Sequence, residues 1–143
     1  MLYQTRSHNI VKGSVFVDID IIKDLRFRSS FSTDYSNLTD DQFFDPMTTD
    51  GEAVGGKAIK GNYRNTTWLN ENTLTYQNSW AEKNDLTLLG GFSVQSSRIN
   101  QSSIRGQGFP EGSGLQNISS ASSITGASDI NTGWGLVSLI GRA

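Results

Sequence analysis

Cysteine is absent from this chain of 143 residues, and histidine occurs once, as His8. The missing thiols exclude disulfide scaffolds, cysteine-ligated zinc and thiol nucleophiles together. A Ser-His-Asp triad would depend on His8, which has nothing like a nucleophile elbow to accompany it and is interpreted as a polar loop residue. Asp18 and Asp20 face basic residues on the next expected strand, unlike a general acid and base. We therefore expect no enzyme activity, no cofactor and no metal site.

An excess of charge of either sign is also missing. Twelve Lys and Arg stand against fourteen Asp and Glu, for a net charge of −2, so no basic field exists to attract nucleic acid. No apolar run approaches the ~20 residues of a transmembrane helix. The first residues lack the charged and apolar regions of a signal peptide. We expect either a cytosolic protein or an internal piece of a longer chain.

Small polar residues, by contrast, are abundant. Ser, Thr and Asn together make 42 of the 143 residues, Gly adds 15, and Pro only 2. Ser, Thr and Asn side chains compete for backbone hydrogen bonds, and Gly costs backbone entropy, so this mixture disfavours helices. The composition therefore predicts an all-β protein.

Alternation of apolar and polar residues predicts two strands near the N-terminus, over 9–22 and 25–36. With Lys23 at the centre of a three-residue loop, the aliphatic positions of both strands share one face. The charged positions then share the other face as cross-strand pairs. The pairs expected on this polar face are Asp18 with Arg28 and Asp20 with Arg26.

Weaker alternation predicts three further strands and two long polar loops. The strands span 65–80, 86–97 and 132–143, and the loops span 37–64 and 98–131. A five-residue turn after Trp80 would set Tyr76 opposite Gly90, with the tyrosine ring over the bare glycine backbone. On the last strand the small and aliphatic odd positions share a face, although Trp134 and Ile140 blur that assignment.

The expected connections alternate between short turns and long loops. In an antiparallel meander this places the short turns at one end of the sheet and the long loops at the other, as in outer-membrane barrels. Strands of ~9–11 residues cross a bilayer when tilted. Trp68 and Trp80 lie twelve positions apart on one face, or ~28–30 Å along the membrane normal at a tilt of ~45°, which is typical of two aromatic girdles. The girdle candidates are Tyr35, Trp68, Tyr76 and Trp80.

Seven short segments form an ordered set along the chain. They are Arg6, Val-Lys-Gly at 11–13, Ile-Lys-Asp-Leu-Arg-Phe-Arg-Ser-Ser-Phe at 22–31, Asn-Thr-Leu-Thr-Tyr at 72–76, Leu-Leu-Gly at 88–90, Gly-Phe-Pro at 108–110 and Ser-Leu-Ile-Gly-Arg at 138–142. In order and spacing this set resembles the barrel region of the SusC/RagA-type TonB-dependent outer-membrane transporters. The similarity covers nearly the whole chain.

This resemblance implies that residues 1–143 are an open segment of a large transmembrane β-barrel, with about five long strands and no plug domain. It also implies the bacterial outer membrane as location, and import of glycan or peptide nutrients by a longer protein. The implied partners are a SusD-like surface lipoprotein, TonB and outer-membrane lipid.

A soluble β-sandwich that binds carbohydrate is the alternative interpretation. The two differ in what the apolar face meets, which is lipid in a barrel and a second layer in a sandwich. For the barrel segment we expect a single sheet with few contacts between its loops. The weak candidates for ligand contact are the loop aromatics Phe43, Phe44 and Phe109.

Overall fold

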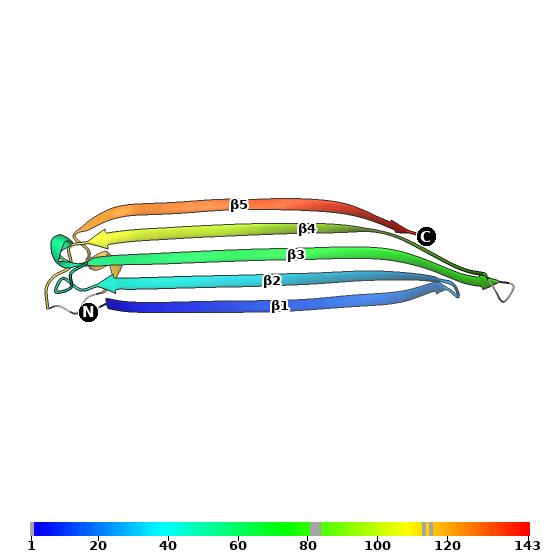
Figure 1. The fold of residues 1–143 in the computed structure, drawn as a ribbon, viewed down its shortest axis with the longest axis horizontal. Helices are drawn as coiled ribbons and strands as arrows, with labels where there is room; N and C mark the ends of the chain where they lie inside the picture. The colour runs from blue at the N-terminus through cyan, green and yellow to red at the C-terminus, as the bar shows by residue number, and fades with distance from the viewer. Residues whose placement is uncertain (1, 81–83, 113, 115) are drawn as a thin grey trace. The chain divides into compact units, whose positions relative to one another are not determined.

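The computed structural model describes residues 2–80, 84–112, 114 and 116–143, and for Trp80 only the backbone. Five strands account for most of it (Figure 1): β1 (Leu2–Ile22), β2 (Leu25–Phe44), β3 (Lys57–Trp80), β4 (Asn84–Gln107) and β5 (Ser123–Arg142). The helical segments among the described residues are two 3-10 turns, η1 (Glu52–Val54) and η2 (Ile118–Ser120). The all-β class and the five-stranded antiparallel meander predicted from the sequence are confirmed.

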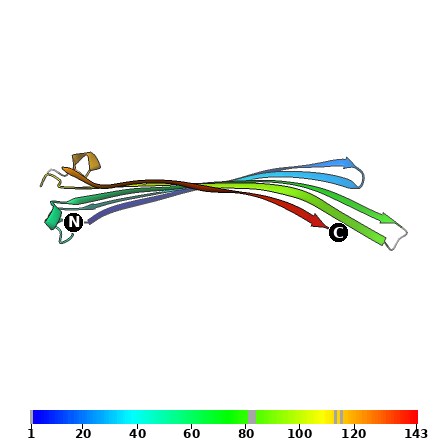
Figure 2. The ribbon, with the colours of Figure 1, turned by 90° about the horizontal axis from the view of Figure 1, so that it is seen from above.

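All five strands belong to one sheet, in the order β1-β2-β3-β4-β5. Each strand therefore pairs with the strand that precedes or follows it in the sequence. A sandwich requires two sheets packed face to face. The view in Figure 2 shows no second sheet among the described residues, so the β-sandwich alternative is wrong.

The strands extend beyond their predicted bounds, and the predicted loops 37–64 and 98–131 shrink to 45–56 and 108–122. The start of β1 shows why the strands are longer than predicted. Apolar and polar residues do not alternate there, but polar side chains form hydrogen bonds with side chains of β2. Arg6 Nη2 donates to Asp40 Oδ2 at 2.9 Å, and His8 Nε2 lies 2.9 Å from Ser36 Oγ. His8 is thus a strand residue and not the loop residue expected.

Polar side chains also connect the end of β2 to the start of β3. Lys60 Nζ donates to Asp41 Oδ2 at 3.0 Å, and Asn62 Nδ2 donates to Asn37 Oδ1 at 3.1 Å. Side-chain hydrogen bonds between opposite polar residues support strand pairing without apolar alternation. Alternation alone therefore could not find these segments.

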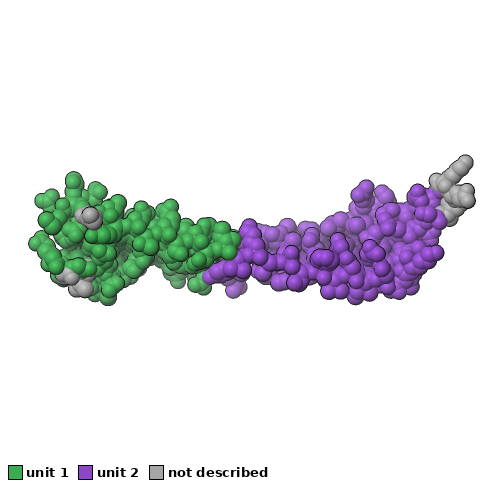
Figure 3. Space-filling model, turned by 90° about the horizontal axis from the view of Figure 1, so that it is seen from below, with its two compact units in different colours: residues 1–10, 36–65, 99–132 green, residues 11–35, 66–98, 133–143 purple. Residues whose placement is uncertain are grey.

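The chain divides into two compact units (Figure 3). Unit 1 comprises residues 1–10, 36–65 and 99–132, and it contains both longer connections. Unit 2 comprises residues 11–35, 66–98 and 133–143, and it contains the β1–β2 turn at Lys23 and Asp24. β4 begins at Asn84, and the β3–β4 turn, expected over residues 81–85, falls for residues 81–83 outside the described part of the chain.

Unit 1 has a small apolar core built from its two longer connections and the adjoining strand ends. Phe43, Ala58 and Phe109 are 7%, 1% and 5% exposed, and Ile118 and Ala121 pack against them. The Phe43 and Phe109 rings meet edge to face, with centroids 5.0 Å apart.

Backbone hydrogen bonds tie the two connections of unit 1 together. Gly108 donates to the carbonyl oxygens of Val54 and Gly56 at 3.0 and 3.1 Å, and Phe109 donates to Gly55 at 2.6 Å. Gly108 has φ of 74°, a conformation that favours glycine. The expectation of few contacts between the loops is therefore wrong.

Candidate functional site

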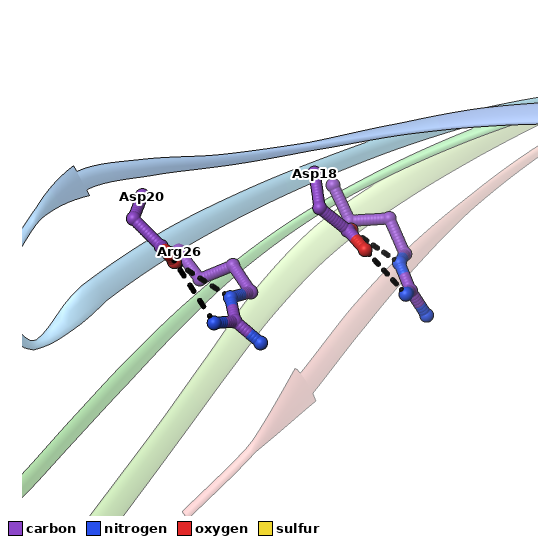
Figure 4. Close-up of polar contacts among 4 residues, drawn as sticks. Asp18, Asp20 and Arg26 are labelled. Atoms are coloured by element: carbon purple, nitrogen blue, oxygen red, sulfur yellow. Dashed lines mark hydrogen bonds and ion pairs between the residues drawn. The ribbon is translucent and has the colours of Figure 1, made fainter.

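Two ion pairs lie on one face of the β1–β2 hairpin in unit 2 (Figure 4). Arg28 donates from Nε to Asp18 Oδ1 at 2.6 Å and from Nη2 to Asp18 Oδ2 at 2.7 Å. Arg26 binds Asp20 in the same way, at 2.7 and 3.3 Å. Each guanidinium thus forms two bonds with its carboxylate, the geometry that makes such pairs specific. These are the four side chains and the register predicted from the sequence.

The ion pairs are solvated. The four side chains are between 31% and 65% exposed, and a third pair on the same face, Lys12 with Asp34 at 2.8 Å, is also open to solvent. Exposed pairs of this kind add little stability. They characterise a wet, charged surface and not a protein core.

Hydroxyl and amide groups continue this polar face across the sheet. Thr73, Thr75 and Gln77 of β3 border the same hollow as Arg26 and Arg28. A second hollow is lined by Lys12, Gly13, Ser14, Ser32, Thr33, Asp34, Thr67, Trp68, Leu69 and Gln95. Such a face offers hydrogen bonds and charges to water and polar solutes.

The opposite face of unit 2 is apolar and exposed. Odd positions of β1 and β2 and even positions of β3 and β4 share this face, because Phe31 stacks on Trp68 across β2 and β3. Its large side chains are of the apolar types that usually form protein cores, and yet they are 37% to 68% exposed. They are Val11, Val15, Val17, Ile19, Ile21, Phe31, Trp68, Leu74, Leu88 and Phe92.

The register between β3 and β4 differs from the prediction by two residues. Thr67 Oγ1 donates to Ser97 Oγ at 3.0 Å, and a Cβ added at Gly91 would lie 3.2 Å from Thr73 Cα. Both contacts place Tyr76 opposite Leu88, because β4 begins at Asn84, two residues earlier than expected. A Cβ at Gly90 would meet nothing within 4 Å, so the Tyr76 ring does not cover that glycine.

The structure also assigns the faces of β5. A Cβ added at Gly133 would lie 2.8 Å from the Ser97 carbonyl oxygen, and one at Gly135 would lie 3.8 Å from that of Gln95. The Gly133 Cβ would also lie 3.6 Å from Arg98 Cα, the same arrangement in which Gly91 lies opposite Thr73, so the odd positions of β5 share the apolar face of β4. Val137 and Leu139 belong to that face, whereas Trp134, Leu136 and Ile140 lie on the other.

Of the four girdle candidates, Tyr35, Trp68 and Tyr76 have described side chains, whereas the side chain of Trp80 is outside the described part of the chain. The Phe31 and Trp68 rings stack with centroids 6.3 Å apart and an interplanar angle of 22°. Tyr76 Oη accepts a hydrogen bond from Asn78 Nδ2 at 3.1 Å. Tyr35 belongs to the apolar face by its position on β2.

Asparagines interrupt the apolar face on β3, and their amides are hydrogen-bonded. Asn70 Nδ2 donates to the Ser30 carbonyl oxygen at 3.0 Å, and Asn72 Nδ2 donates to Asn70 Oδ1 at 2.6 Å. Asn78 Nδ2 also donates to Asp24 Oδ2 at 3.1 Å. Satisfying these amides within the sheet lowers the cost of placing them on an apolar surface.

The loop aromatics proposed for ligand contact belong to unit 1. Phe43 and Phe109 form its core, which leaves little of either ring for a ligand. Phe44 lies beneath the Lys57 ammonium, 5.2 Å from its ring centroid. These positions indicate that the three rings pack against other parts of the protein, and we propose no ligand contact for them.

Two carboxylates of unit 1, those of Asp40 and Asp41, are bound by neighbouring side chains. Asp40 accepts hydrogen bonds from Arg6, Gln4 and Gln42, and those from Arg6 and Gln4 hold the pKa of its carboxyl below the usual range. Asp41 pairs with Lys60. No group of three or more His, Cys, Asp or Glu that could hold a metal ion occurs among the described residues.

Across those same residues, no helix has the length and apolarity needed to cross a membrane.

Comparison with known proteins finds similar proteins both by sequence and by structure. No protein-family model matches the chain. TonB-dependent receptor P26 of Formosa agariphila is 28% identical over 116 residues, covering 76% of this chain and 11% of the receptor. TonB-dependent receptor P3 of the same organism is 35% identical over 91 residues, covering 63% of this chain and 9% of the receptor. The chain therefore spans about a tenth of the length of these relatives.

Among solved structures, the RagAB peptide transporter superposes on 97% of this chain with a TM-score of 0.88 and 20% identity, and the match covers 16% of the transporter chain. The "open-open" state of the RagAB peptide importer gives a TM-score of 0.87 with the same coverage. At this identity the structures establish the fold, which is that of a segment of a transporter barrel.

These matches define a class of protein: a five-stranded piece of barrel wall with an apolar face and a polar face. Within that class, the chain is similar to TonB-dependent receptors in sequence and to the RagAB peptide transporter in fold, in agreement with the resemblance that its ordered motifs indicated. The relatives found are receptors and transporters and not enzymes.

Proposed function

We propose that residues 1–143 form part of the barrel wall of a TonB-dependent transporter in the bacterial outer membrane. The observation that carries the proposal is the asymmetry of unit 2, whose apolar side chains are exposed on one face while solvated ion pairs occupy the other. In a membrane barrel the apolar face contacts lipid and the polar face lines a wet lumen. A soluble protein would have to cover the apolar face.

The connections fit this orientation. Outer-membrane barrels have short periplasmic turns and longer extracellular loops. The turn at Lys23 and Asp24 would then be periplasmic. The packed connections 45–56 and 108–122 would be extracellular.

The whole protein would import glycan or peptide nutrients, energised through TonB and assisted by a SusD-like surface lipoprotein. Similarity to TonB-dependent receptors and to a structure named as a peptide transporter supports this part of the proposal. The chain itself supplies wall and lumen surface and performs no catalysis.

The test compares two cysteine substitutions on opposite faces of β1, because the chain has no cysteine of its own. The full-length protein, made free of other reactive cysteines, carries either Val17→Cys or Ser14→Cys and is reconstituted in phosphatidylcholine vesicles. A bimane label on position 17 should be quenched by doxyl-labelled lipid, whereas position 14 should react with a membrane-impermeant maleimide. Equal behaviour of the two positions, with both variants folded, would overturn the barrel-wall assignment.

A further inference from the structure

Two asparagines of β3 lie in the middle of the apolar face of unit 2. The register places Asn72 opposite Phe92 of β4, and Asn70 lies one row away on the same face. Large apolar residues flank the two amides along the strand, with Trp68 on one side and Leu74 on the other. In the barrel wall of the proposed function, both amides therefore lie within the hydrocarbon band.

The hydrogen bonds within the sheet leave part of the Asn72 amide over. Asn72 Nδ2 gives one N–H to Asn70 Oδ1, and Asn70 Nδ2 donates to the Ser30 carbonyl oxygen. No hydrogen bond from a described residue reaches Asn72 Oδ1. Since no unpaired side-chain polar atom is buried in the described part of the chain, that oxygen is open at the surface.

A second copy of the same amide supplies what Asn72 lacks. Acyl chains offer no hydrogen bonds, and an unpaired amide away from water is costly. A primary amide carries an acceptor oxygen and two N–H donors. Two copies of Asn72 related by a two-fold axis can therefore exchange hydrogen bonds, with Nδ2 of each donating to Oδ1 of the other. Asparagine side chains join membrane helices in the same way.

The surroundings of Asn72 allow a second copy to come close. A Cβ added at Gly90 or Gly141 would meet nothing within 4 Å, so bare backbone is exposed there. Small residues let membrane segments approach closely. Arg98 is the one charged residue at a described strand position on this face of unit 2, and it lies six residues along β4 from Phe92. Like charges therefore stay away from the centre of the contact.

The size of the face fits reversible association. Strands β2, β3 and β4 together are ~14 Å wide, and Leu25 to Tyr35 spans ~33 Å, which gives roughly 500 Å². Two copies would then bury roughly 1,000 Å², the lower limit for a specific interface. Val17 of β1 lies two strands from Asn72 and would remain in contact with lipid.

We propose that the apolar face of β2, β3 and β4 binds a second copy of the chain within the membrane, with the two Asn72 amides joined by reciprocal hydrogen bonds about a two-fold axis normal to the bilayer. This inference rests on the proposed function. The second copy supplies a donor for Asn72 Oδ1 and an acceptor for its second N–H. It also covers the exposed rings of Phe31 and Phe92.

The first experiment is disulfide cross-linking of the full-length protein, made free of other reactive cysteines, in phosphatidylcholine vesicles. With copper phenanthroline as oxidant, Asn72→Cys should form a covalent dimer, because its two copies meet at the axis. Asn78→Cys is the matched control on the same strand and face. Position 78 is ~20 Å further along β3, or ~14 Å from the axis at a tilt of ~45°, and it should not cross-link to its own copy.

The second experiment measures energy transfer between copies labelled at Lys23→Cys in the β1–β2 turn. Transfer should rise with the protein-to-lipid ratio. Asn72→Leu should raise the dissociation constant on the order of tenfold, because it removes both reciprocal hydrogen bonds. Asn72→Gln keeps the amide and should restore most of the association. Asn78→Leu should leave it unchanged, because the Asn78 amide is bonded within its own chain to Asp24 and Tyr76.

Three results would each overturn the proposal: no transfer above the random level at any ratio, equal cross-linking at positions 72 and 78, or an unchanged dissociation constant in Asn72→Leu. Bimane labels separate this failure from failure of the barrel wall. Doxyl-labelled lipid should quench a label on Val17→Cys at every ratio, whereas a label on Phe92→Cys should become protected as the ratio rises. Quenching of both labels at every ratio would assign the amides to lipid and leave the barrel wall intact. No quenching at position 17 would contradict the barrel wall itself.

Discussion

Adjacent glycines on β4 offer a test of the packing between β3 and β4. A Cβ at Gly91 would lie 2.5 Å from the Asn72 carbonyl oxygen and 2.9 Å from Thr73 Cγ2. A Cβ at Gly90 would meet nothing within 4 Å. Gly91→Ala should therefore destabilise the protein, and Gly90→Ala should not.

The magnitude follows from the overlap. The contact that an alanine Cβ at position 91 would make with the carbonyl oxygen is about 0.8 Å shorter than the ~3.3 Å at which carbon and carbonyl oxygen ordinarily meet. Backbone of the neighbouring strand has to shift, and overpacking of this kind costs ~1–3 kcal/mol. Both substitutions gain ~0.5–1 kcal/mol from replacing a strand glycine. Because that gain is common to both, the difference between the variants isolates the strain at ~1–3 kcal/mol.

The assay is chemical unfolding of the full-length protein in lipid vesicles, followed by tryptophan fluorescence. Gly91→Ala should lower the midpoint relative to Gly90→Ala, with the slope of the transition unchanged. Gly90→Ala should lie at or above the unsubstituted protein. Coincident transitions for the two alanine variants would refute the close approach of β4 to the Asn72 carbonyl.

Three further outcomes are expected. Arg28→Asp should lower the melting temperature of the full-length protein by placing two acids together, and the exchanged pair Asp18→Arg with Arg28→Asp should recover most of the loss. An unchanged single variant would contradict the pairing. Phe109→Ala should destabilise the unit 1 core by ~3 kcal/mol, read as faster proteolysis within the connection after β4; equal cleavage rates would argue against that core. Because its pKa is lowered, Asp40 stabilises unit 1 above its ordinary carboxyl range, and this contribution is lost as pH falls through the lowered value. Arg6→Gln should move that loss to higher pH, as seen by hydrogen exchange at the start of β1, and an unshifted profile would refute the role of Arg6.

The sequence was most informative where strand residues alternate. Between Val11 and Tyr35 the apolar positions identified both strands and their faces, and the charges identified their register, which the Asp18 and Arg28 contact verifies. Beyond these limits the strands continue through polar residues. Arg6 and Asp40 hold β1 to β2 there, but a hydrogen-bonded pair of polar strands has no periodic hydrophobic pattern to detect.

Residues whose role depends on contacts with residues distant in sequence were harder to predict. Phe43 and Phe109 looked like exposed loop aromatics because nothing local indicated that they meet. Burial depends on the partner, and the partner lies in another connection. Ala58, the most buried residue of that core, has a side chain too common in loops to stand out.

The nature of the error in pairing β3 with β4 explains why the functional interpretation survived it. The earlier start of β4 moved the partner of Tyr76 from Gly90 to Leu88, a shift of two residues. Side chains alternate with a period of two, so an even shift exchanges neighbours but leaves every side chain on its face. A shift of one would have put Phe92 among the ion pairs and Thr73 toward lipid. Membrane and lumen are distinguished by face and not by neighbour, and so a register error that disproves one contact leaves the assignment of the two surfaces intact.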